Sequence, residues 1–152
     1  MEGNLKIQTK RLSLIPCSDE ESKLGHELAH VQQHLMELKK DPLQLGWGPW
    51  FISDKANNQM VGDAGFKGKP NLERKVEIGY GIIDSARNQG YATEAVEALV
   101  KWAFASSYVD KVIAECFVTN LPSIKVLEKV GMSRIAVEKN MLKWEISRMN
   151  VK

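Results

Sequence analysis

The residues most capable of chemistry lie in one short turn, Arg87 to Ala92, whose sequence is RNQGYA. The turn follows an apolar segment, Val76 to Ile83, that is predicted to be a strand, and it precedes a helix predicted to open near Thr93. A glycine at such a turn lets the backbone approach a ligand closely. The free N–H groups of the first helical turn, with the helix dipole, then attract an anion. The turn therefore predicts a cradle for pyrophosphate.

The composition indicates one globular domain, with no sign of a nucleic-acid surface. The chain has 152 residues, of which 43% are hydrophobic and 26% charged, and these values are typical of a soluble protein with a substantial core. The formal net charge is +2 and the Lys and Arg residues are dispersed, so no nucleic-acid partner is expected. Because no apolar run reaches transmembrane length, no membrane partner is expected either.

The cysteines and the N-terminal residues favour a cytoplasmic location. Cys17 and Cys116 provide neither a disulfide framework nor a Cys-x-x-Cys metal motif, and Cys116 lies in an apolar strand where burial is expected. Residues 1–4 have neither the basic nor the apolar region of a signal peptide. No metal cofactor is expected.

The first third of the chain predicts a strand followed by a helical region. Alternating apolar residues predict a strand from Leu5 to Ile15, ended by Pro16. Ser18 to Glu21 matches a capping box, and the Asp-Pro pair at 41–42 is expected to stop the helical region. Between them an apolar stripe recurs at helical spacing, namely Leu24, Leu28, Val31, Leu35 and Leu38.

The remainder of the chain predicts a strand meander followed by alternating helices and strands. The three meander strands are Trp47 to Ser53, Met60 to Phe66 and Val76 to Ile83. After the glycine turn come a long helix, a strand over Lys111 to Val118, a short helix from Asn120 to Gly131, and a closing hairpin. The last strand, Met141 to Met149, is expected to be an edge able to pair in a homodimer. This order predicts an α+β layer with a mixed sheet.

Three blocks of this sequence resemble the GNAT acyltransferase family, whose members move an acetyl group from acetyl-CoA to an amine. The blocks are the turn with its continuation to Ala95, the strand segment Val76 to Tyr80, and Asn120-x-x-Ser123 followed by residues 127–132. Their joint order carries the resemblance, because a lone glycine turn is weak evidence. Thr9 to Leu12 also resembles the branch that acetylates ribosomal-protein N-termini. The resemblance, which runs from residue 5 to about 138, implies a mixed, mostly antiparallel sheet of about six to seven strands flanked by helices.

The resemblance also implies which residues hold acetyl-CoA. The expected donor-binding residues are Ile82, Ile83, Arg87, Asn88, Gln89, Gly90, Tyr91, Ala92, Thr93 and Asn120. Backbone N–H groups from Gln89 to Thr93 would bind the pyrophosphate, and Ile82 and Ile83 would pair with the pantetheine amides as an added strand does. Arg87 is either a phosphate ligand or a solvated surface charge. Asn120 is a helix cap that could also bond CoA.

Two residues are candidate catalysts under the same resemblance. Glu77 lies where the family often places a general base, which is needed because an ammonium must lose a proton before it attacks a thioester. The alternative for Glu77 is an ordinary outward-facing strand residue. The tyrosine that often protonates the departing thiolate is replaced by Leu127. Ser123 is the expected substitute, because a hydroxyl can hydrogen-bond the sulfur and relay a proton; the alternative is a plain first-turn residue.

Histidines and aromatic residues offer two further, weaker hypotheses. His26, His30 and His34 recur at steps of four, which places them on one helix face opposite the leucine stripe. Such spacing can bind zinc, but a solvated helix face is the preferred interpretation. Trp47, Trp50 and Phe51 either line an acceptor pocket or pack on a strand face, and packing is preferred.

The function that the resemblance implies is acetyl-CoA-dependent N-acetyl transfer to a primary amine, by direct transfer and without a covalent enzyme intermediate. The alternative is a catalytically inactive acyl-CoA-binding regulatory module, which the missing tyrosine motivates. A pure protein-interaction domain is a third and weaker hypothesis. The acceptor is expected to be a small-molecule or peptide amine, with residues 17–50 and 138–147 determining which one.

Overall fold

One sheet of eight strands runs through the part of the chain that the computed structural model describes, residues 5–18 and 28–151. Its strands follow the order β1-β2-β3-β4-β5-β6-β8-β7 across the sheet. They are β1 (Ile7–Gln8), β2 (Leu12–Pro16), β3 (Pro49–Asp54), β4 (Met60–Phe66), β5 (Lys75–Ile82), β6 (Lys111–Phe117), β7 (Ser133–Glu138) and β8 (Met141–Ser147). The helices are α1 (Ala29–Lys40), α2 (Tyr91–Phe104) and α3 (Leu121–Val130).

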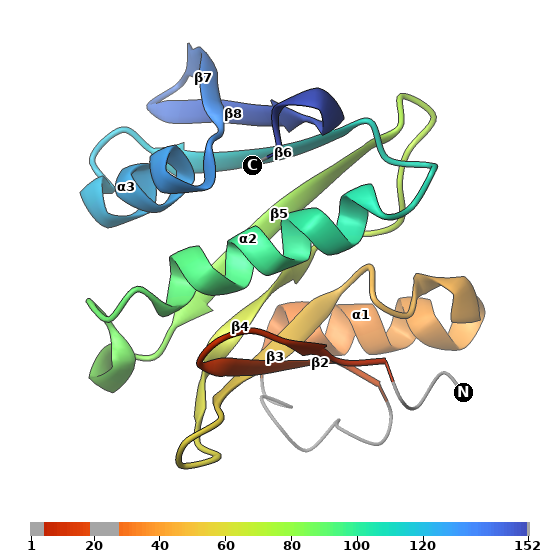
Figure 1. Cartoon of the computed structure of the whole chain (residues 1–152). Coiled ribbons are helices and arrows are strands. Elements are labelled where there is room, and N and C mark those ends of the chain that lie inside the picture. The colour runs from red at the N-terminus through yellow and green to blue at the C-terminus, as the bar shows by residue number, and fades with distance from the viewer. Residues whose placement is uncertain (1–4, 19–27, 152) are drawn as a thin grey trace.

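The helices cover both faces of this sheet. Trp50 and Ile52 of β3 belong to the main core cluster together with Leu99 of α2. Phe51, which lies between them, belongs to a second cluster with Val31 of α1. Because neighbouring side chains of a strand point to opposite faces, α1 and α2 lie on opposite sides of the sheet. Figure 1 shows α2 in green crossing one face, with α3 beside it.

The sheet opens between β5 and β6. β5 and β6 form its parallel pair, and their register joins only Lys75–Glu77 to Lys111–Ile113. The other neighbouring strands pair antiparallel. Beyond Glu77, β5 continues to Ile82 at an increasing distance from β6, as the diverging ribbons in Figure 1 show. Backbone groups on this side of β5 are therefore left for something other than a neighbouring strand.

The expected fold class is confirmed, and the strand count is corrected to eight. The predicted strand from Leu5 to Ile15 is two antiparallel strands, because the chain turns at Thr9 to Arg11. That turn is held by Glu94 of α2, whose Oε2 accepts from Thr9 Oγ1 at 2.5 Å and from the Arg11 N–H at 2.8 Å. The signal for the turn therefore lies 83 residues away in the sequence, and no local pattern contains it.

The later elements match their predictions closely, with one correction. α1 ends before Asp41 and Pro42, and Gly131 ends α3 in the left-handed conformation at φ 102°. β8 is not an edge strand, because it lies between β6 and β7, so the predicted pairing edge belongs to β7. The predicted capping box extends into residues 19–27, outside the described residues, as do Leu24 and His26. In the described ranges no helix is long and apolar enough to cross a membrane.

Candidate active site

The turn before α2 presents a helix start that no side chain caps. Gly90 is the residue before the helix and has φ 81°, in the left-handed region that favours glycine. Asn88 also has a positive φ, 66°, a conformation that asparagine tolerates better than most residues. The helix begins at Tyr91, slightly earlier than the expected opening near Thr93. Its first-turn N–H groups are therefore directed toward the space in front of the turn.

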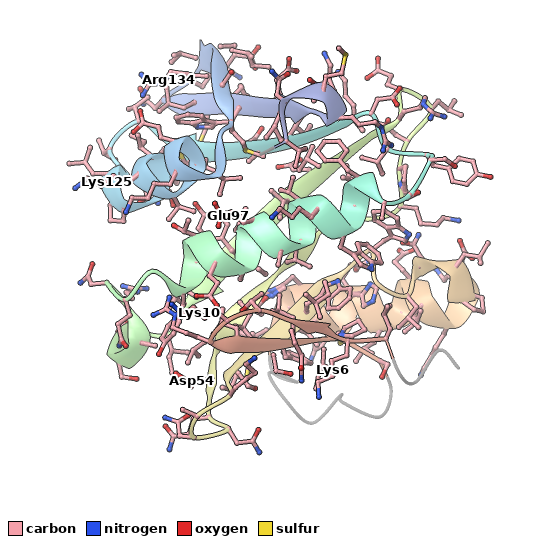
Figure 2. All side chains as sticks on the ribbon, in the orientation of Figure 1. Lys6, Lys10, Asp54, Glu97, Lys125 and Arg134 are labelled. Carbon is pink, nitrogen blue, oxygen red and sulfur yellow. The ribbon has the colours of Figure 1, made fainter. Side chains whose placement is uncertain are left out.

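That space is a cavity of about 710 Å³ between β5, the turn and α3, called here the α2–α3 cavity. It is lined by residues 80–82 and 86–93 together with Asn120, Pro122, Ser123, Lys125, Val126 and Lys129. The lining includes three cations, Arg87, Lys125 and Lys129, and no carboxylate. Figure 2 labels Lys125 on α3, at the same end of the molecule as the turn. A cavity with this charge and an open helix start suits a polyanion.

Arg87 and the isoleucines differ in how far they suit their expected roles. Arg87 Nε donates to the Ile82 carbonyl at 3.1 Å, and its Nη1 lies 3.0 Å from Asp84, with the side chain mostly exposed. Ile82 lines the α2–α3 cavity. The N–H of Ile83 instead donates to the Val61 carbonyl at 2.9 Å, so it is not available to a ligand. The Ile83 side chain is 46% exposed.

On α3, the predicted cap is present, and the position that holds a tyrosine in many relatives is buried Leu127. Asn120 Oδ1 accepts the Ser123 N–H at 3.2 Å, so Asn120 caps the helix as well as lining the α2–α3 cavity. Ser123 lines the same cavity. Leu127 is fully buried in the core, so that position could not present an acid to the cavity. The Tyr80 hydroxyl is nearby and donates to the Ser123 carbonyl at 3.4 Å. Burial raises the pKa of Tyr80 above its ordinary value of 10.0.

A second cavity, of about 670 Å³, lies on the α1 side of the sheet and is called here the α1 cavity. Its polar lining is His30, Gln33, His34, Glu37, Gln44, Asp63, Lys67 and Tyr80. Tyr80 and Gly81 line both cavities. Because α1 and α2 cover opposite faces, the two cavities reach the same point of β5 from opposite sides. Two ligands, one in each cavity, would meet at this point.

The histidine face of α1 is not solvated as expected. His34 is only 7% exposed and lies against Gly48, where an added Cβ would be 2.1 Å from the ring Nδ1. Burial lowers the pKa of His34, although its backbone hydrogen bond to Cys17 opposes the shift. His30 Nε2 lies 2.6 Å from Asp63 Oδ2 of β4. In the described part of the chain no group of three or more His, Cys, Asp or Glu residues is arranged to hold a metal ion.

Glu77 lies away from the junction of the two cavities. Its Oε2 accepts from Lys67 Nζ at 3.0 Å, its side chain is 25% exposed, and it lines neither cavity. The aromatic residues pack as preferred: Trp47 and Trp50 contact Trp102 with ring centroids 4.7 and 5.2 Å apart. Cys116 is buried in the main core, also as expected.

Sequence reasoning missed several residues that line the cavities, among them Tyr80, Asp63, Lys125 and Lys129. A local signal existed for some of them. Tyr80 closes one of the blocks that carry the family resemblance, and Lys125 and Lys129 are one helical turn apart on α3. Asp63 had no such signal, because its importance depends on the pairing of β4 with β5 and on contact with α1.

The fold and sequence place the chain among acetyltransferases. A family model described as the acetyltransferase (GNAT) domain matches residues 15–133, and the chain therefore belongs to the GNAT family. It is similar to the uncharacterized N-acetyltransferase YjdG of Bacillus subtilis, with 40% identity over 86 residues, which are 57% of this chain and 51% of that relative. It is 37% identical over 62 residues to YnaD of the same organism, covering 41% of this chain and 36% of that relative. The chain thus matches about half or less of these curated relatives.

Solved structures show the same fold. A ribosomal-protein-S5-alanine acetyltransferase from Vibrio fischeri superposes with a TM-score of 0.75 at 15% identity, covering 98% of this chain and 100% of the other. The spermidine N-acetyltransferase of Vibrio cholerae, in complex with CoA and spermine, gives 0.76 at 13% identity, covering 93% of this chain and 98% of the other. At these identities the likeness shows the fold alone, so the expected kinship with the ribosomal-protein branch stays a prediction.

Proposed function

We propose that this protein is an acetyl-CoA-dependent N-acetyltransferase that binds its acyl donor in the α2–α3 cavity and its amine acceptor in the α1 cavity. The observation that carries the proposal is that both cavities are lined by Tyr80 and Gly81. An acetyl group carried to this point from one side is within reach of an amine arriving from the other. Direct transfer needs this proximity of the two reacting groups.

Three features support CoA as the donor. The uncapped start of α2 offers N–H groups to a pyrophosphate. The three cations of the lining add charge-assisted contacts to phosphate. The backbone groups of Tyr80 and the N–H of Ile82 point away from β4, because antiparallel pairing alternates and Ile83 is bonded to β4. They face the gap beside β6, where a pantetheine chain could add as a strand does. The Vibrio cholerae neighbour of the same fold has CoA bound.

Ser123 is the proposed group that bonds the departing sulfur, and Glu77 is the base that the family resemblance implies, acting directly or through a water. Ser123 is well situated for that role, because it lines the α2–α3 cavity beside Tyr80. Glu77 has weaker support, because it is paired to Lys67 outside both cavities.

Calorimetric titration with acetyl-CoA, followed by turnover assays on a panel of amines, tests the proposal. We expect binding, and acetylation of at least one amine with release of CoA. A Gly90→Asp variant should lose acetyl-CoA binding, because the new carboxylate would lie where the pyrophosphate is proposed to bind. Absence of binding by folded protein at millimolar acetyl-CoA would contradict the proposal. Binding without turnover on any amine would instead support the inactive CoA-binding module, which the buried Leu127 motivates.

A further inference from the structure

A histidine and a carboxylate form a pair at the wall of the α1 cavity. His30 of α1 and Asp63 of β4 both line this cavity, and His30 Nε2 is 2.6 Å from Asp63 Oδ2. The His30 side chain is 54% exposed and the Asp63 side chain 17%. The pair comes from two elements separated by 33 residues. One ring nitrogen of His30 is therefore oriented by a carboxylate, which leaves Nδ1 as the nitrogen able to take a proton.

The pair lies at the level of the point where the two cavities meet. Asp63 is the cross-strand partner of Gly81, and Gly81 lines both cavities. Glu77 is four residues before Gly81 on the same strand, a separation of about 13 Å at strand geometry. The Glu77 carboxylate also accepts a hydrogen bond from the Lys67 ammonium. A base must be within hydrogen-bond distance of its proton, directly or through one water, so the pair is better placed than Glu77.

The strands near His30 and Asp63 carry glycines where they line the α1 cavity. Gly65, Gly79 and Gly81 occupy this part of the cavity floor. A Cβ added at Gly79 would meet only Lys67 Cε, at 3.7 Å, and one added at Gly81 would meet nothing within 4 Å. Gly79 and Gly81 therefore leave room for a substrate between the strands and α1.

We propose that His30, held by Asp63, takes the proton from the acceptor ammonium in the proposed transfer reaction. An alkyl ammonium enters the α1 cavity and gives one proton to His30, which later passes it to solvent. The neutral amine nitrogen forms a bond to the thioester carbonyl carbon, and the C–S bond then breaks. The second proton of the nitrogen goes to the sulfur, so the products are the acetamide and free CoA thiol. This inference rests on the function proposed above.

The charges around His30 favour a cationic acceptor. From α1, Glu37 lies two helical turns further along, about 10 Å away, and His34 is biased toward the neutral form because burial lowers its pKa. From β4 and the residues after it come Asp63 and Lys67, and the Lys67 ammonium is bound by Glu77. From β5 come Glu77, which holds Lys67, and Tyr80, whose phenol donates to the Ser123 carbonyl on the α3 side. The carboxylates of Glu37 and Asp63 therefore face the cavity and attract an ammonium.

The test compares His30→Ala, His30→Gln and Asp63→Asn with two controls. Lys39→Ala changes an exposed residue of α1 that lines neither cavity, and Glu77→Gln removes the rival base. For the His30 variants we expect kcat/KM for the acceptor to fall by roughly 10²–10⁴-fold, as for loss of a general base. Acetyl-CoA affinity should be unchanged, and added imidazole should restore activity to His30→Ala. Asp63→Asn should lower kcat more than it raises KM, with partial recovery in Asp63→Glu.

The controls separate this inference from the proposed function. Wild-type turnover establishes the proposed function independently, and bound acetyl-CoA shows that each variant is folded. If wild-type protein acetylates an amine while His30→Ala keeps kcat/KM within about threefold of it, the inference is overturned and the function stands. Loss of activity in Glu77→Gln alone would also overturn it. Loss in His30→Ala without rescue by imidazole would assign His30 a structural role and contradict the proposal.

Discussion

Arg11 holds Glu94 with 2.7 Å between its Nε and the carboxylate Oε1, and its Nη1 donates to the Gln89 carbonyl at 2.8 Å. The Arg11 guanidinium therefore connects the turn between β1 and β2 to Gln89, in the turn before α2, and to Glu94, in the first turn of α2. Burial would raise the pKa of Glu94, but hydrogen bonds from Thr9 and Arg11 outweigh it and hold that pKa below its ordinary value. The start of α2 is supported by a strand turn that contributes nothing to the lining of either cavity.

Replacing Arg11 should weaken donor binding without removing a donor contact. In Arg11→Met the Gln89 carbonyl loses its support, so the turn should become less ordered before acetyl-CoA binds. We expect the Kd for acetyl-CoA to rise by about tenfold, equal to about 1.4 kcal/mol. Calorimetry checks the value, and Lys10→Met, at the neighbouring exposed position, is the control. An unchanged Kd would show that the turn is ordered without Arg11.

Reversing a charge in the α2–α3 cavity should also weaken donor binding, but in a salt-dependent way. Lys125→Glu places a carboxylate among a lining that has none, so phosphate would be repelled. We expect the Kd for acetyl-CoA to rise at low salt by about tenfold or more, with a smaller effect at high ionic strength. Lys139→Glu, in the hairpin turn outside this lining, is the matched control. Equal effects of both variants would point to net charge rather than to the cavity.

Filling the glycine floor should block the acceptor and spare the donor. Gly79 lines the α1 cavity and not the α2–α3 cavity, and a Cβ added there would clash with no neighbouring atom. Gly79→Ala and Gly79→Val should therefore fold and should raise the acceptor KM progressively, while the acetyl-CoA Kd stays constant. Steady-state kinetics on both substrates measures the split. A parallel loss of affinity for acetyl-CoA would mean that the two cavities are not separate substrate sites.

Tyr80 should contribute to the chemical step, since it lines both cavities and its hydroxyl donates to the Ser123 carbonyl. Tyr80→Phe removes a proton donor and little volume, so kcat should fall by roughly 10–100-fold with a smaller change in either KM. Because burial raises the pKa of this phenol above 10.0, it stays protonated as the pH rises through the neutral range. Tyr80 should therefore cause no loss of wild-type activity between pH 7 and about 9. Tyr108→Phe, at an exposed position, is the control.

The stability of the fold should decrease in mild acid because of His34. Its pKa in the folded chain is below the ordinary 6.5, so the unfolded chain binds this proton more tightly. The free energy of unfolding should therefore be at its full value above pH 6.5 and should fall as the pH drops below it. Urea unfolding of wild type and His34→Gln at several pH values measures the difference. We expect a shallower pH dependence in the variant, and an identical slope would contradict the prediction.

Local sequence determined the parts of this protein that depend on residues near one another in the chain. The cap at Asn120, the left-handed Gly90 and Gly131, and the stop at the 41–42 pair all follow from the preferences of single residues over one turn. The glycine turn before α2 was predictable for the same reason. So was the order of strands and helices, with one turn missed, because alternation and helical spacing are local patterns.

Tertiary structure decided how these parts combine. The divergence of β5 from β6 and the meeting of two cavities at Tyr80 depend on strand pairing between distant segments. The same pairing put Lys67 against Glu77 and set Asp63 opposite Gly81. These relationships come from register and from the packing of α1 on the sheet, which no short window of sequence contains. The sequence by itself therefore determined the glycine turn before α2. The fold decided which residues face the point where the two cavities meet, where we propose that the acetyl group is transferred.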